Sequence, residues 1–171
     1  FNDLAQWGID METTGPVEYD GSASFPDEGL WDTPMYYSVR CRYANGIRLV
    51  MHDVEPRAVR FEGTKGWIMV NDDGRVYADP PAMLTNVTFE QQRYDVMYGH
   101  LRDFLDCVKT RARPIAHAEA AHRSTTVCHA GNICLRLGRR LEWDPEKEQI
   151  TNSEEANSML HYDYRAPWKL S

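Results

Sequence analysis

Three short turns between residues 35 and 79 constrain the fold of this chain more than any other feature of its sequence. The first is Asn45-Gly46, which separates the segments MYYSVRCRYA and IRLVMHDV. Asn-Gly favours the positive φ angles of a type I′ turn, so these segments predict a β-hairpin. The turns Thr64-Lys65-Gly66 and Asp73-Gly74 separate the further runs AVRFEG, WIMVND and RVYAD. Strands joined by such short turns are antiparallel, because parallel neighbours need a crossover of about a dozen residues.

One further strand is expected before these turns. Residues 17–25, VEYDGSASF, alternate apolar and polar side chains, and the segment PDEGLWDTP after them predicts a loop. Pro80-Pro81 ends the run of strands, since proline cannot donate to a strand ladder. Residues 17–79 are therefore expected to form a mainly antiparallel sheet of about six strands.

The second half of the chain changes to the helix period. Residues 94–111 predict an amphipathic helix that Pro114 limits, and residues 118–138 predict a second helix with Gly138 as its C-cap. The apolar side of the first helix comprises Met97, Leu101, Phe104, Leu105 and Val108. The sheet-facing side of the second comprises Ala120, Ser124, Val127, Gly131, Cys134 and Leu135. Smaller elements are expected as a helix over 1–9, an edge strand over 140–144, a short helix over 153–160 and an extended tail over 161–170.

Strands followed by helices are typical of an α+β domain. We expect a single domain over residues 1–171, a two-layer sandwich with an open sheet and helices on one face. Two helices can cover only one face of the sheet, whereas the alternation along the strands places apolar and aromatic side chains on both faces. These side chains are Tyr36, Tyr37, Tyr43, Val50, Trp67 and Met69. The second face is expected to meet another copy in a homodimer or higher oligomer, the alternative being a solvated face with scattered aromatic residues.

Composition and charge argue against several classes of protein. The chain has 19 basic and 26 acidic residues and a net charge of −7. This disfavours binding to nucleic acids and anionic membranes, because both need a basic face. No uncharged apolar run approaches the roughly 18 residues of a membrane span. The chain begins at Phe1 inside a helical pattern, so we expect that the first turns of this helix, and any targeting signal, precede it.

Motifs that identify a catalytic or metal site by themselves are absent from the sequence. It contains no GxGxxG after a strand, no Walker loop, no GxSxG and no HExxH. His122 and His129 are separated by about 10 Å of helical rise, too far for one zinc ion. The four cysteines form no CxxC pair and are interpreted as free, buried thiols. Asp103 and Asp106 are interpreted as solvated, and Glu119 as a residue that stabilises a helix N-terminus.

Five segments, taken together, resemble one family. They are FNDLAQWG, FEGTKGWIMV, HLRDFLDCVKTRARP, HRSTTVCHAGNICLRLGRRLEWDPEKE and EANSMLHYDYRAPWKL. The family is the glucose–fructose oxidoreductase / inositol dehydrogenase / MocA (Gfo/Idh/MocA) group of nicotinamide-dependent sugar dehydrogenases. The resemblance is to its C-terminal α/β domain, covers essentially the whole chain and is greatest to uncharacterised bacterial members. The segments GTKGWI, DFLDCV and RAPWKL are specific for this family only when they occur together.

The resemblance implies a two-domain enzyme. An N-terminal Rossmann domain would bind NAD(P), and this domain would shape the substrate pocket and form oligomers. Asp3, Leu4 and Trp7 match the end of the family's H-x-x-D-[IL]-x-x-W segment, which puts the catalytic histidine just before Phe1. The dinucleotide loop and the lysine of a Glu-Lys-Pro motif would also lie upstream. This chain is therefore expected to hold no catalytic, cofactor-binding or metal-binding residue and to transfer no hydride alone.

The same resemblance nominates residues that would line the substrate pocket. They come from the loop before the GTKGWI hairpin, from the helix that would carry the missing histidine, and from the start of the second long helix. They are His52, Asp53, Arg57, Asp3, Glu119 and His122. Hydrogen-bonding groups of this kind suit a small sugar-like substrate, because a wrong hydroxyl pattern leaves buried polar partners unpaired. The alternative for each residue is an ordinary loop or cap role.

The full enzyme implied by this resemblance would move a hydride between a sugar-like alcohol and NAD(P). A nonenzymatic binding or dimerisation module is the alternative from another class, and an NAD-dependent glycosidase is the alternative within the family. The family's bacterial members point to the bacterial cytoplasm, or to export if a signal precedes the missing half. The substrate and the choice between NAD and NADP are left open.

Overall fold

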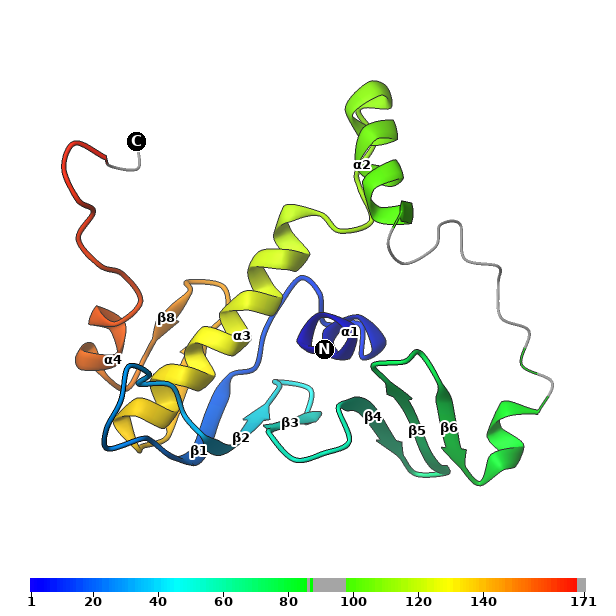
Figure 1. Cartoon of the computed structure of the whole chain (residues 1–171), viewed down its shortest axis with the longest axis horizontal. Helices are drawn as coiled ribbons and strands as arrows, with labels where there is room; N and C mark the ends of the chain where they lie inside the picture. Colours follow the sequence, from blue (N-terminus) through cyan, green and yellow to red (C-terminus); the bar gives the residue numbers. More distant parts are fainter. Residues whose placement is uncertain (86, 88–97, 169–171) are drawn as a thin grey trace. The chain divides into compact units, whose positions relative to one another are not determined.

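The structure, a computed structural model, describes residues 1–85, 87 and 98–168. It groups them into two compact units (Figure 1). One unit comprises Phe1, Asp3–Glu12 and Glu55–His122, and the other comprises Asn2, Thr13–Val54 and Arg123–Ser171. No helix in the described part of the chain is long and apolar enough to cross a membrane.

The second unit contains a five-stranded antiparallel sheet in the order β3-β2-β1-β7-β8. Its strands are β1 (Glu18–Ser24), β2 (Tyr36–Arg42), β3 (Arg48–His52), β7 (Leu141–Asp144) and β8 (Gln149–Ile150). The expected edge strand over 140–144 is thus an inner strand, because β8 pairs with its free side. Strand β7 pairs with β1 across more than a hundred residues of sequence, which local patterns cannot indicate.

The predicted hairpin joins β2 to β3, but its turn is not of type I′. The Tyr43 N–H donates to the Ile47 carbonyl at 2.9 Å, and the Gly46 N–H donates to the Tyr43 carbonyl at 3.0 Å. Gly46 has φ of 88°, and Asn45 is not among the positive-φ residues of the described chain. The loop therefore has three residues and ends in a left-handed glycine, which relieves Asn45 of the strained conformation.

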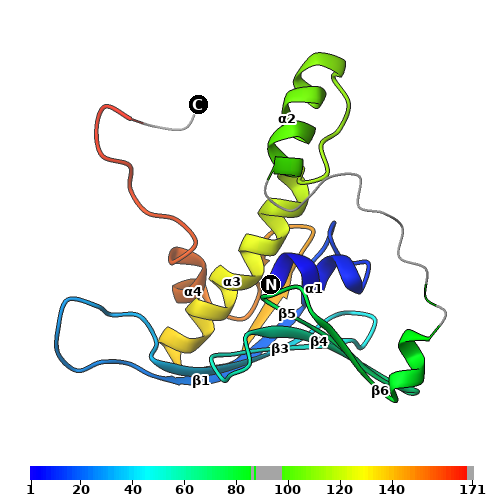
Figure 2. The ribbon, with the colours of Figure 1, turned by 45° about the vertical axis from the view of Figure 1, so that its right-hand side comes forward.

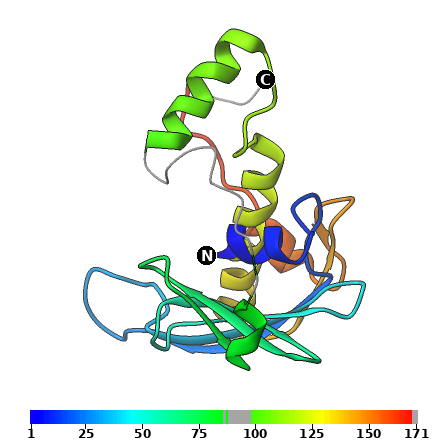
Figure 3. The same cartoon turned by 90° about the vertical axis from the view of Figure 1, so that its right-hand side faces the viewer.

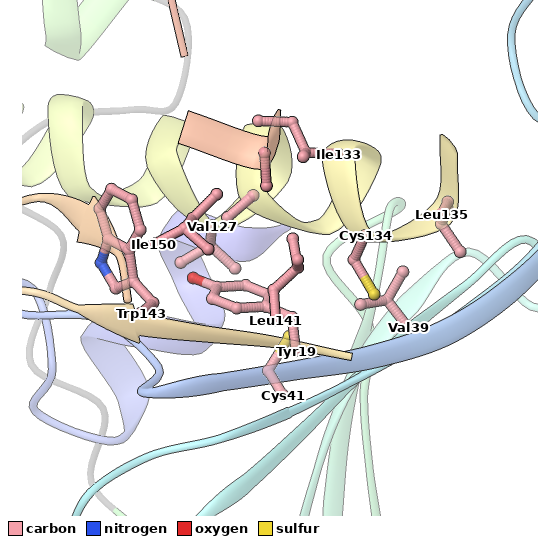
Figure 4. Packing of buried hydrophobic residues seen from close by; sticks show 12 residues of the cluster. Tyr19, Val39, Cys41, Val127, Ile133, Cys134, Leu135, Leu141, Trp143 and Ile150 are labelled. Carbon is pink, nitrogen blue, oxygen red and sulfur yellow. The ribbon is translucent and has the colours of Figure 1, made fainter. Parts of the chain in front are cut away.

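Helix α3 (Ala118–Leu137) packs on one face of this sheet (Figure 2). The core between them comprises Tyr19, Val39, Cys41, Val127, Ala130, Ile133, Cys134, Leu135, Leu141, Trp143, Ile150 and Ala156 (Figure 4). A Cβ built on Gly131 would lie 3.0 Å from the Met51 methyl group, so the small-residue side of the helix lets it approach the sheet closely. Gly138 follows the helix with φ of 59°, which confirms its predicted role as the C-cap.

The first unit contains a three-stranded antiparallel sheet of β4 (Ala58–Gly63), β5 (Gly66–Asn71) and β6 (Val76–Asp79). Helix α1 (Asn2–Gly8) lies on one side of it (Figure 3), where a Cβ on Gly8 would overlap the Phe61 ring. A 3-10 turn, η1 (Pro81–Leu84), follows β6. The proline pair thus ends the strands as predicted.

Two further helices complete the described chain. Helix α2 (Tyr98–Thr110) confirms the predicted amphipathic helix, whose expected start over 94–97, Met97 included, lies outside the described residues. Asp103 was expected in solvent, but only 7% of it is exposed, because its carboxylate accepts the Ile115 N–H at 2.8 Å. Helix α4 (Glu154–Ser158) begins at Ser153, whose hydroxyl accepts the Ala156 N–H.

The architecture confirms an α+β fold with open antiparallel sheets. Six strands lie between residues 17 and 79 as predicted, but they divide between two sheets. The division falls at the connection between β3 and β4, residues 53–57, which contains Pro56 and no tight-turn dipeptide. Strand β3 is therefore the edge of the five-stranded sheet, and β4 begins a separate ladder.

Candidate functional site

The end of strand β3 places two of the nominated residues side by side. The Nδ1 atom of His52 accepts the Val54 N–H at 3.2 Å, and Asp53 Oδ1 accepts the Tyr37 N–H at 3.3 Å. Both side chains are exposed. Because Nδ1 of His52 is an acceptor, the neutral ring carries its proton on Nε2. The strand end therefore presents an imidazole N–H donor and a carboxylate acceptor, a pair suited to a hydroxyl group.

Arg57 immediately precedes strand β4. Its N–H donates to Glu55 Oε2 at 3.0 Å, and its carbonyl accepts the Asp72 N–H at 3.1 Å. These bonds fix the backbone at Arg57, while the residue itself is exposed. Its exposed guanidinium offers several donors to a polar ligand.

Asp3 lies in the first turn of α1, directly after Asn2. The Asn2 amide nitrogen lies 3.0 Å from Met51 Sδ and 2.9 Å from Cys128 Sγ. Asn2 thus lies beside Met51, the residue that precedes His52, and beside Cys128 of α3. Sequence reasoning did not nominate Asn2, because its partners lie 49 and 126 residues away and nothing local signals the contact.

Glu119 and His122 lie in the first turns of α3, three residues apart and hence on one side of the helix. Both are exposed. The helix start is fastened by His117, whose Nδ1 accepts the Ala120 N–H at 3.2 Å. The structure therefore places the six nominated residues at four points: the end of β3, the start of β4, α1 and the start of α3. Their role in a substrate site stays a prediction.

The cysteines are free, but their environments differ. Cys41 and Cys134 are buried as expected, whereas Cys107 is half-buried and Cys128 is exposed. Burial raises the pKa of the Cys41 thiol to about 12 and that of the Cys134 thiol to about 11. Thiols held in the protonated form are poor nucleophiles, so both belong to the core rather than to a reactive site. Within the described residues, no group of three His, Cys, Asp or Glu side chains could hold a metal ion.

A shallow pocket of about 280 Å³ lies beneath the loop between β1 and β2. It is lined by Phe25, Pro26, Asp32 and Arg136. The Arg136 guanidinium donates to the Asp32 carboxylate at 3.3 Å and to the Asp32 carbonyl at 3.2 Å. The Arg136 guanidinium thus binds the loop between β1 and β2 to α3. Asp32 and Arg136 are 104 residues apart, so no sequence pattern links them.

The described residues contain no Rossmann-type sheet. Such a sheet needs parallel strands, a crossover helix and a glycine-rich turn at the helix N-terminus. Every strand pairing described in this chain is antiparallel.

Comparison with known protein families gives a match over nearly the whole chain. The family described as "Oxidoreductase family, C-terminal alpha/beta domain" (GFO_IDH_MocA_C2) matches residues 2–170. No curated protein matches the sequence.

Two solved structures share the fold. An aldose–aldose oxidoreductase from Caulobacter crescentus, complexed with glycerol, is 16% identical with a TM-score of 0.64 over 82% of this chain and 44% of its own. The WlbA dehydrogenase from Chromobacterium violaceum, in complex with NADH and UDP-GlcNAcA, is 16% identical. Its TM-score is 0.52 over 84% of this chain and 43% of its own. This chain therefore spans less than half the length of either protein.

Proposed function

The chain belongs to the Gfo/Idh/MocA oxidoreductase family, as a form of its C-terminal α/β domain, and we propose that it forms the substrate-binding and oligomer-forming half of an NAD(P)-dependent sugar or polyol oxidoreductase. The observation that carries the proposal is the match of the family over residues 2–170. The structural neighbours supply the context, since their names describe an oxidoreductase and a dehydrogenase and one structure contains NADH. In this proposal the NAD(P) site belongs to a part of the protein outside this chain.

The polar groups at the end of β3 and the start of β4 support a sugar-like substrate. His52 and Asp53 offer a donor and an acceptor, and Arg57 offers a guanidinium, all exposed on fixed backbone. A sugar hydroxyl both donates and accepts hydrogen bonds, so a site with donors and an acceptor suits it. Asp3, Glu119 and His122 are proposed as further contributors.

The face of the five-stranded sheet opposite α3 supports the oligomer-forming role. Asp20 and Arg40 face each other across β1 and β2 at 2.6 Å, and Glu18 accepts from Arg42 and Arg140, each at 2.7 Å. The sequence analysis expected an apolar second face, but here charged pairs accompany the exposed Tyr36 and Val50. These two residues are 72% and 51% exposed, whereas Tyr43 is buried. Because these charges are paired within the chain, the exposed Tyr36 and Val50 are the part of this face that a second copy would cover.

The proposal is tested on the complete reading frame that encodes this chain. We expect the full-length protein to bind NADH or NADPH and to oxidise members of a panel of aldoses and polyols. His52→Gln and Arg57→Gln should raise KM at least tenfold, whereas Lys65→Gln, in the exposed turn between β4 and β5, should leave KM unchanged. A full-length protein that binds neither coenzyme would overturn the proposal in favour of a binding module. Release of a sugar without net NADH formation would indicate a glycosidase.

The oligomer is tested by light scattering. The full-length protein should be a dimer or larger at micromolar concentration, and Val50→Glu should weaken it, because the interface would have to desolvate an added carboxylate even though Arg40 lies opposite on β2. Lys65→Glu serves as the control for added negative charge. A monomeric wild-type protein would contradict the proposed oligomer-forming role.

A further inference from the structure

Two sulfur atoms from different elements converge on one point beside α3. The Asn2 side-chain nitrogen lies 3.0 Å from Met51 Sδ and 2.9 Å from Cys128 Sγ, so the two sulfurs cannot be farther apart than the sum of these distances. Met51 belongs to β3 and Cys128 to α3. A Cβ on Gly131, three residues after Cys128, would lie 3.0 Å from the Met51 methyl group. The Met51 side chain therefore lies along the side of α3 that carries Cys128.

We propose that Cys128 and Met51 form a binding site for a soft monovalent metal ion, copper(I), with the Asn2 amide as a third ligand. A thiolate and a thioether together favour copper(I), whereas zinc is bound by thiolate, imidazole and carboxylate groups. Two metal–sulfur bonds of about 2.3 Å in line span about 4.6 Å. This span lies within the limit that Asn2 sets on the separation of the two sulfurs.

Both sulfurs can offer lone pairs to a cation. The Cys128 thiol donates to the Ser124 carbonyl at 3.5 Å, so its sulfur meets Asn2 as an acceptor. The Met51 thioether has no proton and can only accept. Rotation of the Asn2 amide by half a turn replaces its N–H group by its carbonyl oxygen. Binding of the ion thus forms a sulfur–metal bond, releases the thiol proton to solvent and turns the amide.

A buried hydroxyl within electrostatic range of Cys128 is a second sign of a bound group. The ring of Tyr19 lies between the sheet and α3 (Figure 4), and its hydroxyl is buried without a hydrogen-bond partner among the described residues. Buried polar groups are normally paired. Burial raises the pKa of Tyr19, and Cys41, Tyr43 and Cys128 raise it further. A polar group bound at Cys128 would supply a partner for this hydroxyl.

The proposed site consists of ligand types that the common metal motifs do not contain. The chain has no CxxC pair. In its described part, no group of three His, Cys, Asp or Glu side chains could hold a metal ion. A thioether belongs to neither pattern, and the fold alone unites positions 2, 51 and 128. The inference goes beyond the proposed oxidoreductase function and does not depend on it.

Competition for copper(I) tests the inference on the product of the complete reading frame. The protein is titrated with copper(I) against a coloured copper(I) chelator, with ascorbate and without oxygen. We expect Cys128→Ser and Met51→Leu each to weaken one tight copper(I) equivalent by roughly a hundredfold or more, because each removes a direct ligand. Cys107→Ser and Met159→Leu are the controls, since they change a half-buried thiol and an exposed thioether elsewhere. Both controls should retain that equivalent.

X-ray absorption at the copper edge reports the ligands directly. The spectrum of the wild-type protein should show two sulfur neighbours at about 2.3 Å and one lighter neighbour, and that of Met51→Leu should show one sulfur fewer. Zinc(II) in excess should not displace the copper(I). The metal-free variants should unfold at nearly the wild-type urea midpoint, because Cys128 is exposed and leucine has about the volume of methionine.

Four results would overturn the inference. They are a wild-type protein without a tight copper(I) equivalent, an unchanged affinity in Cys128→Ser, an unchanged sulfur count in Met51→Leu, and displacement of copper(I) by zinc(II). The third result would show that Cys128 binds the ion without Met51, which contradicts a site formed by both sulfurs.

Discussion

Two glycines at the interface between α3 and the five-stranded sheet allow the packing of the domain to be tested with matched substitutions. A Cβ on Gly21 would lie 2.5 Å from the Ser38 carbonyl oxygen and 3.0 Å from the Val39 Cα atom. Both obstacles are backbone atoms of the paired strand β2, so Gly21→Ala must move the strand or bend it. Overpacking of this kind costs about 1–3 kcal/mol, while replacing glycine recovers about 0.5–1 kcal/mol of chain entropy. We expect Gly21→Ala to lower the free energy of unfolding by about 1–2 kcal/mol.

Gly131→Ala introduces the same methyl group on the other side of the interface. Its Cβ would lie 3.0 Å from Met51 Cε, the end of a flexible side chain, and 3.6 Å or more from Val39. Met51 can yield by a few tenths of an ångström, and alanine is about 1 kcal/mol better than glycine inside a helix. We therefore expect Gly131→Ala to be neutral or to stabilise the protein by up to about 1 kcal/mol.

Urea unfolding monitored by tryptophan fluorescence measures both variants. Trp143 is buried in this unit and reports its unfolding, Trp67 is half-buried in the first unit, and Trp7, Trp31 and Trp168 are exposed. With a slope of about 2 kcal/mol per molar urea, Gly21→Ala should lower the transition midpoint by roughly 0.5–1 M. If Gly21→Ala were neutral while Gly131→Ala was strongly destabilising, the described packing of α3 on the sheet would be wrong.

Three further predictions concern thiols, alkaline pH and ion pairs. A thiol reagent should modify exposed Cys128 rapidly in the folded chain and reach Cys41 only after unfolding; equal rates would contradict the described core. Folding raises the pKa of Cys41 from 9.0 to about 12 and that of Cys134 to about 11. The free energy that these two protonated thiols contribute to stability should therefore be complete below pH 9.0 and fall as the pH rises through 11 to 12. Urea midpoints that stay constant over that range would refute this. Glu18→Gln should cost about 1 kcal/mol or less at low salt and less still at about 1 M NaCl, because its arginine partners are half exposed; a larger, salt-independent loss would show that charge pairing is not the cause.

Local chemistry was sufficient to predict most elements of this chain. The turns around Gly46, Gly66 and Gly74 follow from the conformational freedom of glycine, and the side of α3 that packs on the sheet follows from its small side chains. Gly138 could be predicted as a helix cap for the same reason. Each of these features depends on side chains within a few residues of one another, so the amino-acid order contains the necessary information.

The candidate site could be predicted only in part from the sequence. Resemblance to a family nominated His52, Asp53 and Arg57, and the structure adds how the backbone around each is held. The contact of Asn2 with Met51 and Cys128 could not be predicted, because polar residues at the start of a chain carry no signal of a distant partner.

What the sequence determined by itself was the series of strands and helices, because hydrophobic period and turn residues act over short distances. What only the tertiary structure decided was which strands share a sheet and which side of each helix is covered. Pairing of β1 with β7 and burial of Asp103 by the Ile115 N–H both join segments that are not neighbours on one element. Many distant segments compete for the same backbone and side-chain groups. Local sequence patterns therefore cannot predict which of these segments form the contacts.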